Sequence, residues 1–152
     1  MVTGGSDIPR RFFSPEERSR IAAAIGEAEM HTSGEIRLFL ERDVKGESED
    51  PYARARQVFA RLKMHETAER NGVLIYLAVR SRRFAIVGDE ELHKRVGEGY
   101  WTEIRDLMAG EFADGRFTEG LVAGIAAIGE KLGRHFPRRP DDINELPDDI
   151  AF

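Results

Sequence analysis

Five polar residues with chemically useful side chains lie at the ends of three predicted strands: Glu35, Arg70, Asn71, Asp89 and Glu90. Carboxylate and amide oxygens are the ligands that Ca²⁺ and Mg²⁺ prefer, whereas the guanidinium group of an arginine suits a phosphate. The alternative is structural, with Asn71 in a turn, Asp89 capping the next helix and Glu35 paired with a surface base. Because no fixed ligand spacing such as that of an EF-hand loop is present, both interpretations stay open.

The first half of the chain predicts the elements around Glu35. Ser14 and Glu17 have the spacing of a capping box, with a proline at the first helical position, so a helix is expected to begin there. Ile36, Leu38 and Leu40 then alternate with Glu35, Arg37 and Glu41, which predicts a strand over 36–40. A polar stretch follows as a loop, and Asp50 with the proline after it opens a second helix.

Two further strands are expected in the middle of the chain. Residues 73–79 form a continuous apolar run, which is typical of a strand covered on both faces. Residues 84–87 follow after a short polar turn, so these two strands should form an antiparallel hairpin. The helix between strands 36–40 and 73–79 instead indicates a parallel pair with a right-handed crossover. The predicted fold class is therefore α/β, a three-layer α/β/α sandwich with a small mixed sheet.

This topology brings the five polar residues to one edge of the sheet. The first two strands start at that edge, whereas the third runs in the opposite direction and ends there. We therefore expect three chain segments that are far apart in the sequence to converge there: Glu35, Arg70 with Asn71, and Asp89 with Glu90.

The second half of the chain is predicted to be helical. From about Glu91 the helical spacing of apolar residues continues to the end of the core, and Gly115 is expected to cap a helix. Six apolar residues fall on one stripe of this region: Tyr100, Trp101, Ile104, Leu107, Met108 and Phe112. In the last helix, Gly124 and Gly129 are expected to let a neighbouring element approach closely.

Composition restricts the function classes. The 152 residues are 41% hydrophobic and 34% charged, as in a soluble globular domain, and the absence of cysteine excludes disulfides and thiolate chemistry. The net charge of −5 lies in residues 141–152, which hold five acids and no base, so the neutral remainder gives no reason to expect nucleic-acid binding. The apolar runs are too short for a transmembrane segment, and the N-terminus has no apolar signal region. A cytoplasmic location is therefore expected.

Four segments together resemble the TPM domain family: Thr32–Arg37, Arg70–Ile75, Phe84–Asp89 and Phe112–Leu121. The resemblance covers roughly residues 12–136, and the family includes thylakoid-lumen acid-phosphatase-like and photosystem II repair proteins. It implies an α/β/α sandwich and, for some members, calcium binding and acid phosphatase activity.

The chain departs from the family pattern in two places. Family members show Asn-Asn-Gly where this chain has an arginine, Arg70, before Asn71 and Gly72. After the third strand they continue Tyr-Gly-Leu-Glu, whereas this chain reads Asp-Glu-Glu-Leu from Asp89. Asn71 therefore transfers by position, and Asp89 and Glu90 do not.

The residues and the resemblance together predict a phosphatase that acts on phosphoesters and depends on Ca²⁺ or Mg²⁺. Its expected metal ligands are Glu35, Asp89 and Glu90, and its expected catalytic residues are Arg70 and Asn71. In this hypothesis the metal polarises the phosphoryl oxygen and Arg70 neutralises its charge. The alternative is a non-catalytic interaction module that binds a protein partner.

The sequence predicts that the chain consists of one domain with a segment at each end. Residues 1–11 are predicted to be a flexible N-terminus, 12–136 the TPM-like domain and 137–152 an acidic tail. The tail mixes its acids with four apolar residues, which either dock on the domain or bind a partner: Ile143, Leu146, Ile150 and Phe152.

Overall fold

The computed structural model describes residues 7–46, 49–140 and 150–152, which contain helices and strands in mixed order. The elements along the chain are α1 (Pro9–Phe12), α2 (Pro15–Glu29), β1 (Ile36–Glu41), α3 (Pro51–Arg61), the 3-10 helix η1 (Met64–Glu66), β2 (Val73–Ala78), β3 (Arg83–Gly88), α4 (Glu90–Val96), α5 (Thr102–Ala113) and α6 (Phe117–His135). None of the helices in these ranges is long and apolar enough to cross a bilayer.

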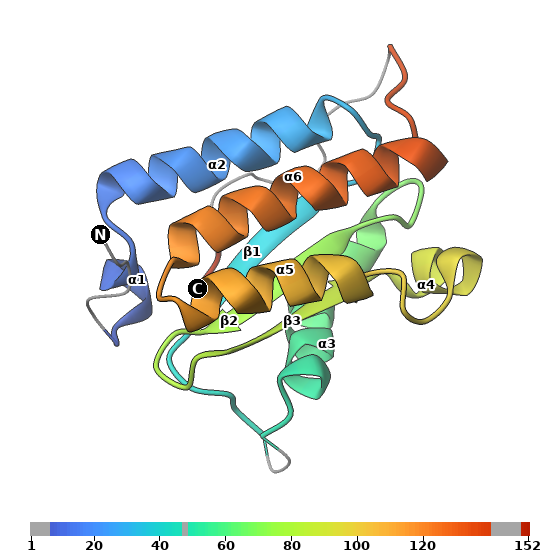
Figure 1. Cartoon of the computed structure of the whole chain (residues 1–152). Helices are drawn as coiled ribbons and strands as arrows, with labels where there is room; N and C mark the ends of the chain where they lie inside the picture. The colour runs from blue at the N-terminus through green and yellow to red at the C-terminus, as the bar shows by residue number, and fades with distance from the viewer. Residues whose placement is uncertain (1–6, 47–48, 141–149) are drawn as a thin grey trace.

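The strands form one small mixed sheet in the order β1-β2-β3. β1 and β2 are parallel, with Ile36 opposite Val73, and β3 is antiparallel to β2, with Gly88 opposite Val73. Helices α2, α5 and α6 cover one face of the sheet, and α3 covers the other (Figure 1). The predicted three-layer α/β/α sandwich is therefore confirmed.

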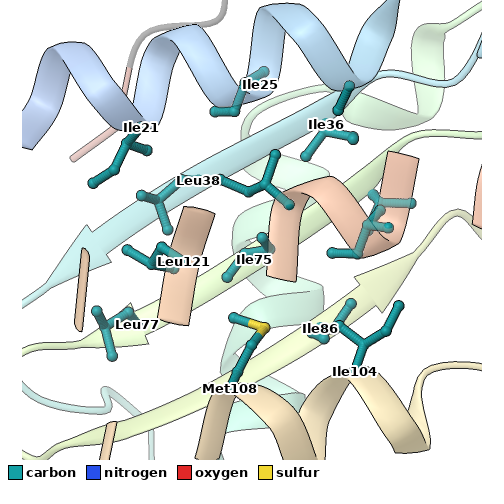
Figure 2. Close-up of a cluster of buried hydrophobic side chains, with 14 of the residues drawn as sticks. Ile21, Ile25, Ile36, Leu38, Ile75, Leu77, Ile86, Ile104, Met108 and Leu121 are labelled. Atoms are coloured by element: carbon teal, nitrogen blue, oxygen red, sulfur yellow. The ribbon is translucent and has the colours of Figure 1, made fainter. Parts of the chain in front are cut away.

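Two hydrophobic clusters fill the spaces between the layers. Side chains of α2, α5 and α6 pack on one face of all three strands, and Figure 2 labels ten residues of this cluster, from the helices and from the strands. The second cluster joins α3 to the opposite face, where Val58 and Phe59 pack near Phe39 and Tyr76. Every residue of β2 is buried, because this central strand contributes to both clusters. The continuous apolar run of this segment is thus explained by its position.

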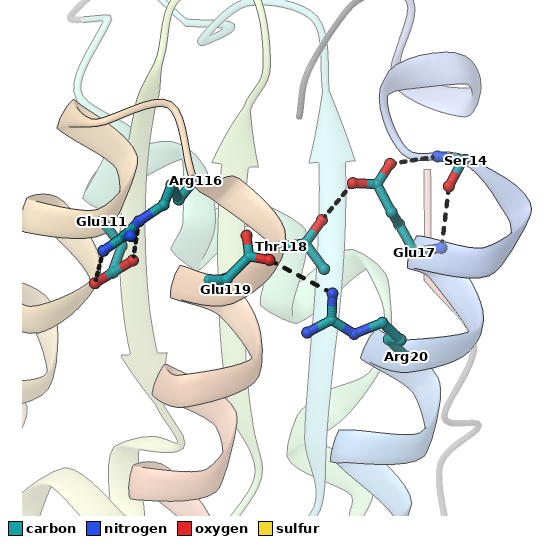
Figure 3. Close-up of polar contacts among 7 residues, drawn as sticks. All are labelled: Ser14, Glu17, Arg20, Glu111, Arg116, Thr118 and Glu119. Atoms are coloured by element: carbon teal, nitrogen blue, oxygen red, sulfur yellow. Dashed lines mark hydrogen bonds and ion pairs between the residues drawn. The ribbon is translucent and has the colours of Figure 1, made fainter. Parts of the chain in front are cut away.

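Helices α2 and α6 lie side by side and are joined by apolar and polar contacts. A Cβ atom added to Gly129 would lie 2.6 Å from the Cβ of Ala28, so only a glycine permits this approach. At the other end of the pair, the Thr118 hydroxyl donates to Glu17 Oε2 at 2.9 Å (Figure 3). Glu17 also completes the predicted capping box with Ser14, and its side chain therefore both starts α2 and links it to α6.

The prediction of continuous helix from about residue 91 is wrong at one place. Helix α4 ends at Val96, and α5 begins only at Thr102. Gly97 and Gly99 have φ of +77° and +80°, a left-handed conformation that breaks the helix and turns the chain. Trp101 consequently lies in the turn before α5 rather than on a helical stripe, together with the tyrosine that precedes it.

The C-terminal residues 150–152 lie beside the outer edge of β1. Ala151 accepts a hydrogen bond from the Leu40 N–H and donates its own N–H to the Leu38 carbonyl, both at 2.9 Å. Ile150 and Phe152 pack against the larger cluster, so the end of the tail docks on the domain. The expected contributions of Ile143 and Leu146 lie outside the described residues.

Candidate functional site

Three chain segments meet at one edge of the sheet, as the predicted strand directions require. The Glu35 carbonyl accepts a hydrogen bond from the Val73 N–H, which aligns the starts of β1 and β2. The Gly72 carbonyl accepts one from the Asp89 N–H, which aligns the end of β3 with the same edge. Both bonds are 2.8 Å long. The backbone thus brings the five predicted site residues into one neighbourhood.

Arg70 and Asp89 form the central polar contact of this neighbourhood. Arg70 Nε donates to Asp89 Oδ2 at 3.1 Å, and the other carboxylate oxygen accepts from the Glu91 N–H at 3.0 Å. The Asp89 side chain is fully buried, whereas that of Arg70 is 41% exposed. Asp89 is therefore the cap of α4, as the structural alternative predicted, and is also the anchor of a half-exposed guanidinium group.

The other three predicted residues differ in their exposure to solvent. Asn71 is buried, and its side-chain amide donates to the Ser33 hydroxyl at 3.2 Å. Glu35 is buried as well, and Glu90 is exposed on the first turn of α4. The shared edge therefore does not place all five side chains in one site.

A pocket of about 890 Å³ lies along the free edge of β3. This volume is within the range of about 300–1,000 Å³ that is usual for small-molecule sites. Helix α3 and η1 form one side of the pocket, and α4, the glycine turn and α5 form the other. Arg70, Asp89 and Glu90 line it, whereas Glu35 and Asn71 do not. The structure thus joins three of the five predicted site residues around one cavity.

The residues that line the pocket and were not predicted as site residues from the sequence include Arg56, His65, His93, Trp101 and Arg105. His93 could have been noticed, because it follows Glu90 by three residues and such spacing places two side chains on one helix face. The arginines gave no signal, since each occupies an exposed position on a different helix. Their common feature, the cavity beside β3, exists only in the folded chain.

The charges around the pocket are balanced at neutral pH. Three arginines (Arg56, Arg70 and Arg105) face three acids, namely Glu98 and the already named Asp89 and Glu90. Only Asp89 among these acids is buried, and it is paired with Arg70.

The donor set at this edge does not fit Ca²⁺ or Mg²⁺ as it is arranged. Ca²⁺ takes about six to eight oxygen ligands and Mg²⁺ about six. The buried carboxylate of Asp89 already binds a cation, the Arg70 guanidinium, and Glu35 is not in the pocket. Within residues 7–46, 49–140 and 150–152, no group of three or more histidine, aspartate and glutamate side chains is placed to hold a metal ion.

A second polar cluster lies at the opposite end of the sheet. The Glu41 carboxylate accepts hydrogen bonds from Arg54 Nε at 3.0 Å and Nη2 at 2.9 Å, and another from the buried Tyr76 hydroxyl. Burial disfavours the charged carboxylate, but the bonds from Arg54 and Tyr76 outweigh burial and lower the pKa of Glu41. Burial together with the bond to Glu41 raises the pKa of Tyr76. Because all three side chains satisfy one another, this cluster is a structural network rather than a site.

Comparisons with known proteins agree with this architecture. The TPM domain family matches residues 8–131 of the chain. The NMR structure of the BA42 protein from the psychrophilic bacterium Bizionia argentinensis is similar, with a TM-score of 0.85 and 42% sequence identity over 93% of this chain and 95% of that chain. A comparison with curated proteins gives no match. Since the family match spans most of the sequence, the chain belongs to the TPM domain family.

Proposed function

We propose that this TPM domain binds a phosphoester in the pocket beside β3 and hydrolyses it. The observation that supports the proposal is the set of three pocket arginines, which reach the cavity from α3, from the turn before β2 and from α5. A guanidinium group forms charge-assisted, often bidentate, hydrogen bonds with phosphate oxygens. The size of the cavity, about 890 Å³, leaves room for the organic part of the ester.

The pocket residues suggest which side chains would bind the phosphoester and which would take part in its hydrolysis. Arg56 and Arg105 would bind the phosphate oxygens, and Arg70, held in place by Asp89, would neutralise charge that develops during transfer. Water would attack the phosphorus atom as the bond to the leaving oxygen breaks, and one of the two pocket histidines would supply the proton to that oxygen. The half-buried Trp101 would contact an apolar leaving group.

Binding of inorganic phosphate and of phenyl phosphate, measured by calorimetry, tests the first half of the proposal. The double variant Arg56→Ala/Arg105→Ala should weaken binding by about 100-fold, because it removes two charge-assisted hydrogen bonds of about 1.5 kcal/mol each. Arg116→Ala is the matched control, because Arg116 pairs with Glu111 on the surface and does not line the pocket. Equal affinity of the double variant and the control would contradict the proposal.

Release of phosphate from a panel of phosphoesters tests the second half. The assay is run at mildly acidic and neutral pH, because the family resemblance implies acid phosphatase activity for some members. Parallel samples contain Ca²⁺, Mg²⁺ or a chelator, since a divalent cofactor remains a prediction from the sequence. Binding without turnover would leave an anion-binding module and remove the catalytic part of the proposal.

A non-catalytic interaction module is the second candidate, and one observation favours it. β3 is an edge strand, and the segment Ile86–Gly88 lines the pocket. An extended peptide could pair with this edge, as in other cases of strand addition, and acidic side chains could meet the flanking arginines. A peptide that shifts the amide resonances of Val87 and Gly88, and that phosphate does not displace, would favour this function over hydrolysis.

A further inference from the structure

The Asp89 carboxylate is enclosed in a way that requires a permanent counter-ion. Its side chain has no exposed surface, and a buried carboxylate is stable only when it is paired and hydrogen-bonded. The Glu91 N–H satisfies one oxygen and Arg70 Nε satisfies the other. The only full positive charge in direct contact with this carboxylate, among the described residues, is that of Arg70.

The backbone at Arg70 holds the guanidinium in this place. Arg70 has φ of +53°, in the left-handed region that non-glycine residues seldom occupy and that asparagine tolerates best. Its N–H donates to the Thr67 carbonyl at 3.3 Å, which closes the turn before β2. An arginine in this conformation is intrinsically unfavourable, so its contact with Asp89 gives a physical reason for its presence.

We propose that the Arg70 guanidinium is the resident cation of this edge and excludes Ca²⁺ and Mg²⁺ from the Asp89 carboxylate. A divalent ion at Asp89 would have to displace Arg70 or lie beside its positive charge, and both are unfavourable. The inference disagrees with the calcium binding expected from the resemblance, and it holds whether or not the pocket binds a phosphoester.

The permanent charge of the guanidinium is a further support for the exclusion. The hydrogen bond and the charge of Asp89 raise the pKa of Arg70, and the charges of Glu91 and Glu90 raise it further. An arginine guanidinium is effectively always protonated in proteins, so this charge is permanent. Because Nε makes the contact with Asp89, the terminal amino groups of Arg70 could still donate to an anion.

Removal of the resident cation should create a response to calcium. Arg70→Asn suits the left-handed backbone and leaves the Asp89 carboxylate without its counter-ion. The wild-type melting temperature should stay the same when calcium chloride replaces sodium chloride at equal ionic strength. That of Arg70→Asn should be lower in chelator and rise by about 5 °C in saturating calcium, because a ligand that binds only the folded state stabilises it.

Two control variants make the result specific. Arg70→Asn/Asp89→Asn lacks the carboxylate and should lose the calcium response. Arg116→Asn also removes an ion pair, but its partner Glu111 is 25% exposed and not buried like Asp89, so this variant should show no calcium response. Two results would overturn the inference. One is a calcium response of the wild type that Asp89→Asn abolishes, and the other is a folded Arg70→Asn variant that shows no calcium response.

A measurement on the wild-type chain decides the question if Arg70→Asn does not fold. In ¹⁵N-labelled protein, the Nε–H resonance of Arg70 and the amide resonance of Asp89 should not move during a titration with calcium chloride. The titration extends to a calcium concentration about 1,000 times the dissociation constant of a site with micromolar affinity. Saturable shifts of both resonances would show that calcium reaches the carboxylate and would refute the exclusion.

Discussion

Replacement of Gly129 by alanine tests the close approach of α2 and α6. The new Cβ would lie 2.6 Å from Ala28 Cβ, 3.0 Å from its Cα and 3.2 Å from its carbonyl oxygen. These are atoms of a rigid helix rather than the end of a flexible side chain, so the two helices must move apart. Overpacking of this kind costs about 1–3 kcal/mol, whereas the higher helix propensity of alanine returns about 1 kcal/mol. We expect a net loss of about 0–2 kcal/mol.

Gly110→Ala is the matched control for this experiment. Gly110 lies in α5, and a Cβ added there would meet nothing within 4 Å. This variant should gain up to about 1 kcal/mol from helix propensity alone. The difference between the two variants, about 1–3 kcal/mol, isolates the steric term. Urea unfolding followed by circular dichroism measures it, and a Gly129→Ala variant as stable as Gly110→Ala would refute the packing of α2 against α6.

Three other predictions concern the Glu41 network and the C-terminus. Tyr76→Phe removes a buried hydroxyl that donates to Glu41, and it should destabilise the fold by about 1–3 kcal/mol in urea unfolding. Because the pKa of Glu41 is lower in the folded chain than its ordinary value of 4.5, the carboxylate contributes stability above that pH and loses it as the pH falls through the lower folded pKa. Glu41→Gln should accordingly weaken the fall of melting temperature in acid. A melting temperature that falls equally with pH in the variant and the wild type would contradict this expectation. Deletion of residues 150–152 removes both hydrogen bonds of Ala151 and should cost about 1–3 kcal/mol, whereas an unchanged melting temperature would mean that the end of the tail contributes nothing.

The sequence predicted where the candidate site lies better than it predicted which residues form it. Strand directions alone placed Glu35, Arg70 and Asp89 at one edge, and the register of the sheet confirms that placement. Which side chains face a common cavity could not be predicted, because Glu35 and Asn71 are turned into the protein by packing around them. The roles assigned to all five residues stay predictions.

The break between α4 and α5 shows where a local pattern was insufficient. Apolar residues recur at helical spacing on both sides of Gly97 and Gly99, so periodicity alone predicted one continuous helix. The positive φ of both glycines turns the chain and brings Trp101 and Arg105 toward the pocket. Glycine is compatible with a helix and with a turn, and contacts with the rest of the fold select between them.

The sequence by itself determined the layers, the strand directions and the cap of α2, because each depends on residues close together in the chain: alternation along a strand, apolar runs and a Ser14–Glu17 spacing. The tertiary structure alone decided that Arg70 pairs with Asp89 and that Arg56 and Arg105 share a cavity. These contacts join side chains from different elements, and their distances are set by how the helices pack on the sheet rather than by any local pattern.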